Sequence, residues 1–191
     1  MKYINQHFTN TLEIKQSKFI AHLIPYVQYE NKLQELKNEH PKARHFVTAF
    51  RYLNEFKQIV EHSSDDGEPK GTSGKPSLMV LQGQGIINSA VIIVRYFGGT
   101  KLGTGGLVRA YSDAVNLVLD LAEQIEYKDE ITKKILFSYT NIGKVEYECS
   151  TCRVKIINKV FEDKAVFEIK GSKTNLEELL NKLDRLVTVY P

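Results

Sequence analysis

The chain of 191 residues has no tryptophan and only two cysteines, Cys149 and Cys152, too few for the disulfide framework of a small secreted protein. Its first residues, MKYINQHF, lack the apolar core of a secretory signal peptide. Fully apolar runs such as Val91 to Val94 fall far short of the roughly 20 residues that cross a bilayer. We therefore expect a soluble, cytoplasmic protein without a membrane partner.

A large excess of charge of one sign is also missing. The 26 basic and 23 acidic residues leave a formal net charge of +3. Such a balance does not by itself indicate a nucleic-acid-binding protein, and no DNA sequence specificity is inferred. The hydrophobic content of 42% is sufficient for ordinary cores, so a globular protein is expected. A site for an anion would have to arise from local clustering of basic residues.

Glycine is scarce outside one stretch of the chain, because ten of the twelve glycines lie between Gly67 and Gly106. This stretch begins near DDGEPKGTSGKPS and ends, after an apolar run, with RYFGGTKLGTGGLVR. Residues 69–112 contain no acidic side chain but five basic ones. Glycine allows the backbone to bend tightly or to approach another group closely. The combination predicts a local anion site.

Periodicity predicts short strands and helices in the first two thirds of the chain. Alternating β-branched and aromatic residues indicate strands, and apolar residues at intervals of three and four indicate amphipathic helices. The expected elements are a hairpin over 11–14 and 18–25, a helix over 28–40, a hairpin over 43–52 and 56–61, a long loop over 62–76, a helix over 76–82, a strand over 86–97 and a helix that begins near 104–107.

The remainder of the chain predicts a second, smaller domain. Its order of elements, βαββαβ, is that of a ferredoxin-like domain. Thr174 followed by Glu177 predicts a capping box at its second helix. Charges cluster at 126–130, which divides the chain into domains 1–127 and 128–191. The expected elements are a strand over 132–139, a helix over 142–152, strands over 154–161 and 164–170, a helix over 174–186 and a strand over 187–190.

The glycine-rich segment has the features of an anion-binding helix start. The strand that ends at Phe97 leads through GGTKLGTGG into a helix, which places free backbone N–H groups beside Lys101. Hydroxyl and guanidinium groups nearby can bind the same anion. The alternative is that the glycines only permit a sharp connection between strand and helix. The candidate anion or nucleic-acid contacts are Lys70, Thr72, Ser73, Lys75, Arg95, Gly98, Gly99, Thr100, Lys101, Thr104, Gly105 and Arg109.

The known nucleotide loops and catalytic motifs do not fit this segment. A Walker A loop needs Ser or Thr after its lysine, whereas Leu102 follows Lys101, and the glycine spacing is not GxGxxG. ATP and NAD binding are therefore disfavoured. GTSGK is not the GxSxG elbow, and His45 has no nucleophile motif beside it, so no catalytic residue is assigned. The pair CSTC lacks further zinc ligands.

The acidic residues of the loop, Asp65, Asp66 and Glu68, allow two interpretations. Closely spaced carboxylates suit Mg²⁺, but their spacing matches no complete set of ligands. Alternatively, these acids pair with nearby Lys or Arg groups and hold the loop in place. We expect no cofactor and assign no metal ligand, with Mg²⁺ as the open possibility.

The motifs DDGEPKGTSGKP and VIIVRYFGGTKLGTGGLVRAY resemble those of the Impact/YigZ family, and the resemblance extends to KQSKFIA and ARHFVTAFRY. It implies an α+β protein of two domains. The first would have the fold of ribosomal protein S5 domain 2, an α/β sandwich with helices on one face of a sheet. The second would be ferredoxin-like and resemble domain V of elongation factor G. Eukaryotic members regulate translation initiation through an additional RWD domain, whose partner cannot be transferred to this chain.

Two functional hypotheses follow. The first is a non-catalytic regulatory protein that binds RNA, the ribosome or a translation-associated protein through the basic glycine-rich surface, with Tyr96 and Phe97 available for stacking on bases. The alternative is a metal-dependent enzyme acting on a phosphorylated small molecule, although no base or nucleophile is identifiable. A single cleft that unites residues 65–75 with 98–106 would favour a composite site.

Overall fold

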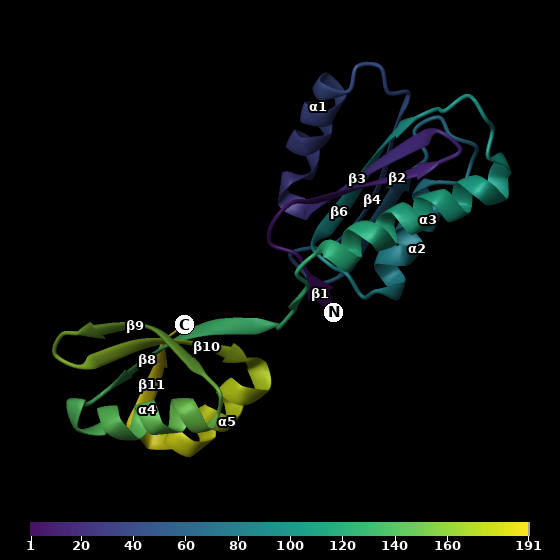
Figure 1. Ribbon diagram of the computed structural model, residues 1–191. Coiled ribbons are helices and arrows are strands. Elements are labelled where there is room, and N and C mark those ends of the chain that lie inside the picture. Colours follow the sequence, from purple (N-terminus) through teal and green to yellow (C-terminus); the bar gives the residue numbers. More distant parts are fainter. Residues whose placement is uncertain (191) are drawn as a thin grey trace. The chain divides into compact units, whose positions relative to one another are not determined.

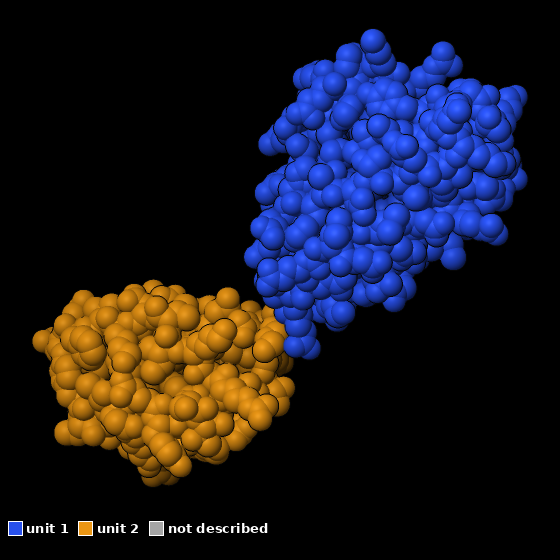
Figure 2. Space-filling view, viewed as in Figure 1, with its two compact units in different colours: residues 1–127 blue, residues 128–191 orange. Residues whose placement is uncertain are grey.

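The structure is a computed structural model that describes residues 1–190 and divides into two compact units, Met1–Tyr127 and Lys128–Pro191 (Figures 1 and 2). Each unit combines helices with antiparallel β-sheet and has hydrophobic core of its own. This mixed α and β architecture confirms the predicted fold class. None of the helices among these residues is long and apolar enough to cross a membrane.

The first unit is built on a five-stranded antiparallel sheet with the strand order β2-β3-β6-β4-β5. Its central strand, β6, has the sequence SAVIIVRY and is buried on both faces. A two-stranded sheet of β1 and β7 joins the two ends of this unit. The strands are β1 Lys2–Tyr3, β2 Phe8–Ile14, β3 Ser17–Pro25, β4 His45–Leu53, β5 Ile59–Ser64, β6 Ser89–Tyr96 and β7 Ile125–Glu126.

Helices cover both faces of this sheet (Figure 1). Two of them, α2 and α3, pack on one face, and the apolar stripe of α3 lies against β2 and β3. On the second face Leu36 of α1 packs against Ile24 and Ile92. The expectation of helices on one face only is therefore corrected, because the central strand carries apolar side chains on both sides. The helical elements are η1 Tyr26–Gln28, α1 Tyr29–Glu39, α2 Gly74–Gly83 and α3 Gly103–Leu121.

The second unit has the predicted βαββαβ order around a four-stranded antiparallel sheet, β11-β8-β10-β9. Alternate residues of β10 face a core that α4 and α5 complete on one side of the sheet. The elements are β8 Glu130–Phe137, η2 Tyr139–Asn141, α4 Ile142–Thr151, β9 Lys155–Phe161, β10 Ala165–Ser172, α5 Lys173–Leu183, η3 Asp184–Leu186 and β11 Val187–Tyr190.

Two local predictions were wrong. The expected loop over 62–76 is shorter, because β5 extends to Ser64 and α2 begins at Gly74. The helix α5 is capped by Ser172, whose hydroxyl accepts a hydrogen bond from the Asn175 N–H at 3.1 Å. The predicted capping box at Thr174 is therefore displaced by two residues, since the strand before it ends in a residue that is itself a good N-cap.

Candidate functional site

Asp65 organises the loop between β5 and α2. Its carboxylate accepts hydrogen bonds from the backbone N–H groups of Gly71 at 2.7 Å, Ser73 at 3.1 Å and Gly74 at 2.8 Å, and from the Ser73 hydroxyl at 2.7 Å. Partial burial alone would raise its pKa, but these donors lower the pKa of Asp65 below the ordinary value. The carboxylate thus satisfies the N–H groups of the N-cap Ser73 and of Gly74, the first residue of α2.

Asp66 joins the same loop to β4. Its Oδ2 accepts a hydrogen bond from the Phe46 N–H at 2.6 Å, and its backbone oxygen lies 2.8 Å from His45 Nδ1. Because a carbonyl oxygen only accepts, Nδ1 of His45 carries the proton. His45 Nε2 then lies 4.0 Å from Glu68 Oε1. Asp66 therefore fixes the loop to the sheet, whereas Asp65 holds the loop to the start of α2.

Glu68 and Arg95 form a buried ion pair beneath the loop, with exposed fractions of 8% and 6%. The Tyr111 hydroxyl donates a hydrogen bond of 2.8 Å to Glu68 Oε1. Burial, with the nearby carboxylate, raises the pKa of Tyr111 well above its ordinary value, so the hydroxyl remains a donor. The Arg95 guanidinium lies over the rings of Phe19 and Phe97, 5.3 and 5.9 Å from their centroids.

This pair changes the role expected for Arg95. The sequence analysis placed it among the surface cations, whereas its charge is compensated by Glu68 and its side chain is enclosed. The apolar residues of the helix recur at helical spacing with Tyr111 among them, which predicts that Tyr111 faces the core but does not predict the partner of its hydroxyl. The residue pattern signals a buried tyrosine, but only the tertiary fold brings Glu68 to it.

One cleft unites the two glycine-rich segments. It has a volume of about 350 Å³, and the Glu68–Arg95 pair lies within its wall. The loop after β5 contributes one side, and the connection from β6 to α3 contributes the other. The cleft is lined by Glu68, Pro69, Arg95, Phe97, Lys101, Leu102, Gly103, Thr104 and Leu107. The composite arrangement that the sequence left open is therefore present.

The start of α3 opens onto this cleft. Leu102 is the N-cap, and its side chain makes no capping hydrogen bond, whereas at α2 the Gly74 N–H donates to the Asp65 carboxylate. The first N–H groups of an α-helix have no partner within the helix and carry a partial positive charge. Gly103 and Thr104 of the first turn line the cleft, and the exposed Lys101 precedes them. Helix N–H groups and a lysine therefore meet at this corner of the cleft.

The glycines of the connection differ in what they do. A Cβ on Gly98 would lie 2.0 Å from the backbone carbon of Gln16, and the Gly98 N–H donates to Ser17 Oγ at 3.1 Å. Gly98 is therefore required by the close approach of the β2–β3 turn. Gly99 and Gly103 have positive φ angles of 87° and 73°. Gly105 has open space around its Cβ position.

The other predicted contacts fall into two groups. Thr72 and Ser73 are buried and bond within the loop, Thr72 through its hydroxyl to the Pro69 oxygen at 2.7 Å. Their hydroxyls therefore serve the loop itself. The remaining candidates are exposed but lie outside the set of residues that lines the cleft: Lys70, Lys75, Thr100 and Arg109.

The acids of the loop do not form a cluster of free carboxylates. Asp65 binds backbone N–H groups, Asp66 binds Phe46 N–H, and Glu68 binds Arg95. Within residues 1–190 no group of three or more His, Cys, Asp or Glu side chains is arranged to hold a metal ion. Glu68 pairs with an arginine, as one interpretation of these acids predicts, whereas Asp65 and Asp66 hold the loop through backbone N–H groups.

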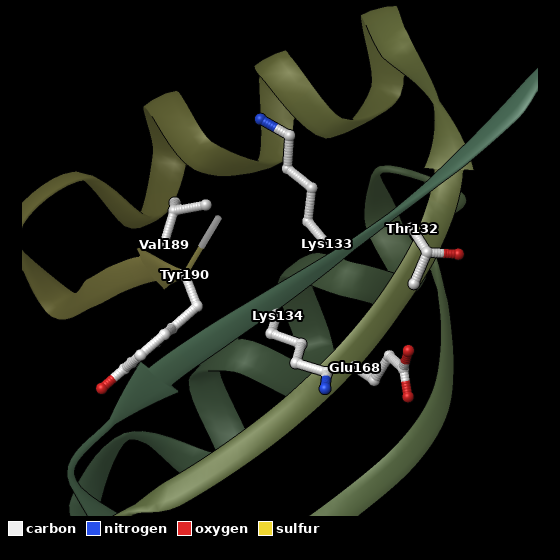
Figure 3. Close-up of a pocket in the computed structure, with 6 residues that line it drawn as sticks. All are labelled: Thr132, Lys133, Lys134, Glu168, Val189 and Tyr190. Carbon is white, nitrogen blue, oxygen red and sulfur yellow. The ribbon is translucent and has the colours of Figure 1, made fainter.

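A second hollow lies on the sheet of the C-terminal unit (Figure 3). Lys134 is the cross-strand partner of both Glu168 and Tyr190, whereas Lys133 points to the opposite side of β8, toward a helix (Figure 3). Most of the residues that line it are exposed, so it is a depression of the surface. The lining residues are Thr132, Lys133, Lys134, Glu168, Val189 and Tyr190.

The two cysteines belong to the core of the C-terminal unit. Burial raises the pKa of the Cys149 thiol to about 11 and also raises that of Cys152. Both thiols are therefore protonated near neutral pH and unsuited to nucleophilic chemistry.

Comparison with known proteins identifies the family of this chain. Residues 15–119 match the Impact N-terminal domain. An IMPACT family member of Haemophilus influenzae is 36% identical over 179 residues, which cover 90% of this chain and 84% of the relative. The IMPACT family member YigZ of Escherichia coli is 35% identical over 176 residues, or 90% of this chain and 85% of YigZ.

A solved structure agrees with the fold. The crystal structure of a hypothetical protein aligns over 98% of this chain and 95% of its own, with a TM-score of 0.63 and 30% sequence identity. The structure of the two-domain translational regulator Yih1 aligns over 63% of this chain and 47% of the Yih1 chain, with 21% sequence identity and a TM-score of only 0.37. The IMPACT family members share about a third of their residues with this chain over most of its length. The chain therefore belongs to the IMPACT family.

Proposed function

We propose that this IMPACT-family protein is a non-catalytic regulatory protein that binds RNA of the translation machinery through the cleft beside α3. Membership of the family fits a regulatory role. The observation that carries the RNA hypothesis is the uncapped start of α3, which opens onto the cleft next to Lys101. Helix N–H groups and a lysine together suit a phosphate oxygen.

The charge around this corner supports an anionic ligand. Arg95 is compensated by Glu68 within the cleft, so the uncompensated positive charge at its mouth comes from Lys101 and from the helix dipole. The exposed Lys70, Lys75 and Arg109 flank the region in sequence and extend the cationic character. A local cationic site in a nearly neutral protein favours a few defined phosphate contacts over wrapping of a long polyanion.

The alternative of a metal-dependent enzyme has less support. Such an enzyme would need carboxylates free to coordinate the metal, but Asp65, Asp66 and Glu68 are engaged by protein groups. Stabilisation of the protein by Mg²⁺ together with a phosphorylated metabolite, in the absence of RNA binding, would favour the enzyme instead.

Neutralising Lys101 tests the proposal. We expect Lys101→Gln to weaken binding of a single-stranded RNA severalfold and to flatten the plot of log affinity against log salt by about 0.7, the share of one phosphate contact. Fluorescence anisotropy of a labelled oligonucleotide over a series of salt concentrations measures both quantities.

The matched control is Lys144→Gln, which removes the same charge from an exposed position on α4 in the other unit. It should leave the affinity and the salt dependence close to those of the unchanged protein. Equal behaviour of the two variants would show that net charge, and not the cleft, accounts for any RNA binding.

A further inference from the structure

The size of the cleft limits what it can hold. Its volume of about 350 Å³ lies near the lower end of the roughly 300–1,000 Å³ found for pockets of small ligands. Its wall includes the apolar side chains of Pro69, Phe97, Leu102 and Leu107. A phosphate alone would make no favourable contact with these apolar groups, and an RNA duplex is too wide to enter a concave site of this size. A ligand with both a flat apolar part and an anionic part fits better.

Phe97 provides a surface for a flat ring. It is 55% exposed although it lies in the wall of the cleft, and the Arg95 guanidinium lies 5.9 Å from the centroid of its ring. Arg95 is enclosed and paired with Glu68, so its position beside the ring is fixed. An exposed aromatic side chain next to a cationic corner is the usual arrangement for stacking on an unpaired base.

The wall of the cleft also contains an unmet hydrogen-bonding group. Arg95 is 6% exposed, and its Nε has no hydrogen-bond partner among residues 1–190. Buried polar groups are nearly always paired in the native state, and an enclosed water commonly supplies a partner that the protein does not. The Glu68–Arg95 pair brings an acceptor and a donor side by side. The edges of nucleobases carry donors and acceptors in the same way.

From these observations together with the open start of α3, we propose that the cleft binds a nucleoside phosphate and takes up one unstacked nucleotide of single-stranded RNA. Its phosphate lies at the N–H groups of Gly103 and Thr104, and its base lies against Phe97. This inference rests on the proposed function and adds the class of RNA and the place of the base. Paired RNA is bound poorly because its bases are already stacked.

Removing the aromatic ring of Phe97 tests whether a base stacks on it. Phe97→Leu keeps an apolar side chain without the aromatic face, and we expect it to weaken binding of a single-stranded 12-mer RNA about tenfold. The salt dependence of RNA binding should be the same for this variant as for the unchanged protein, since no phosphate contact is lost. Phe97→Tyr retains the ring and should keep most of the affinity. Phe56→Leu is the matched control, because Phe56 is 73% exposed in the turn between β4 and β5.

Three small ligands distinguish a free nucleotide from the RNA strand. Inorganic phosphate, a nucleoside and a nucleoside monophosphate are each titrated at millimolar concentration while backbone amide NMR shifts are followed. We expect the monophosphate to shift the amides of Gly103 and Thr104 and the ring signals of Phe97 together, and the 12-mer to produce the same shifts at much lower concentration. Tighter binding of the monophosphate than of the 12-mer would identify a metabolite site and overturn the RNA assignment.

Other outcomes overturn the inference in distinguishable ways. If Lys101→Gln weakens RNA binding while folded Phe97→Leu binds like Phe56→Leu, the proposed function stands and the place of the base is wrong. If a hairpin of the same sequence binds as tightly as the single strand, the choice of unstacked RNA is wrong. Far-UV circular dichroism and thermal melting establish that the variants are folded, and absence of any RNA binding overturns both proposals.

Discussion

Three of the chain's five histidines meet around His22 on the face of the sheet that α1 covers. His22 is 7% exposed, its Nδ1 lies 3.1 Å from His7 Nε2, and its ring centroid lies 6.5 Å from that of His40. Its Nε2 has no partner within residues 1–190. Burial, followed by the charges of His7, Lys32 and His40, lowers the pKa of His22 to about 4, and Glu35 opposes this shift.

The pKa of His22 predicts acid sensitivity. An unfolded histidine binds its proton near the ordinary value of 6.5, whereas the folded protein resists protonation of His22 to about 4. Between these values the unfolded state holds more protons, so stability is lost as the pH falls below about 6.5, approaching about 3 kcal/mol near pH 4. In His22→Gln this loss should be much smaller. Urea unfolding at a series of pH values measures the free energy of unfolding.

His62 supplies the control for this prediction. It is exposed on β5, so His62→Gln makes the same substitution at the surface and leaves the His22 cluster intact. We expect it to keep the pH dependence of the unchanged protein. The attribution to His22 is refuted if His22→Gln retains the full acid sensitivity.

At the scale of single residues, the sequence located the cationic corner but not the buried network. Lys101 and Thr104 could be selected because a glycine-rich connection before a helix is a local pattern. Arg95 could not be separated from the surface cations, because its partner Glu68 lies 27 residues away in sequence. Whether a charged side chain is enclosed depends on which segments the fold brings beside it. The local sequence pattern likewise does not reveal that His22 Nε2 is buried without a hydrogen-bond partner among residues 1–190.

At the scale of elements, the connection from β6 to α3 contains glycines with opposite expected behaviour. A Cβ at Gly98 would meet the backbone at Gln16 at 2.0 Å, so Gly98→Ala forces the β2–β3 turn to move. We expect a loss of about 1–3 kcal/mol or more in the free energy of unfolding. Gly105→Ala meets open space in the first turns of α3 and should stabilise the helix by up to about 1 kcal/mol.

Chemical denaturation of the two variants checks this prediction, and each serves as the control of the other. Both make the same chemical change seven residues apart, so a difference between them reports only on the surroundings. Similar free energies of unfolding for Gly98→Ala and Gly105→Ala would contradict the close packing of Gly98 against the turn. The sequence alone left open whether the glycines are structural, and the structure divides them by position.

Element prediction succeeded where one face of an element is apolar and failed where it is not. The central strand β6 and the helix α3 have strong apolar patterns and were found with small errors at their ends. The edge strand β5 has the sequence IVEHSS, in which polar residues occupy both faces, so its second half was assigned to the loop. An edge strand pairs on one side only and leaves weaker constraints on its side chains.

At the scale of the whole molecule, the two units have separate hydrophobic cores. The first unit is closed by its own ends, since Lys2 pairs with Glu126, and the Tyr127 N–H donates to the Met1 oxygen at 2.9 Å. Every residue that lines the cleft belongs to this unit. A chain that stops after Tyr127 therefore retains the core, the closing sheet and the cleft.

Two truncated chains test whether the first unit folds and binds RNA by itself and whether the β1–β7 sheet stabilises it. We expect residues 1–127 to unfold cooperatively and to bind single-stranded RNA with the same dependence on Lys101 as the full chain. Residues 1–121 keep α3 to its last residue but lose β7, so the β1–β7 sheet cannot form and the melting temperature should fall by several degrees. Calorimetry of both fragments and of the full chain measures these transitions. If 1–127 folds but has lost its RNA binding, the second unit supplies essential contacts and the cleft alone is not the binding site.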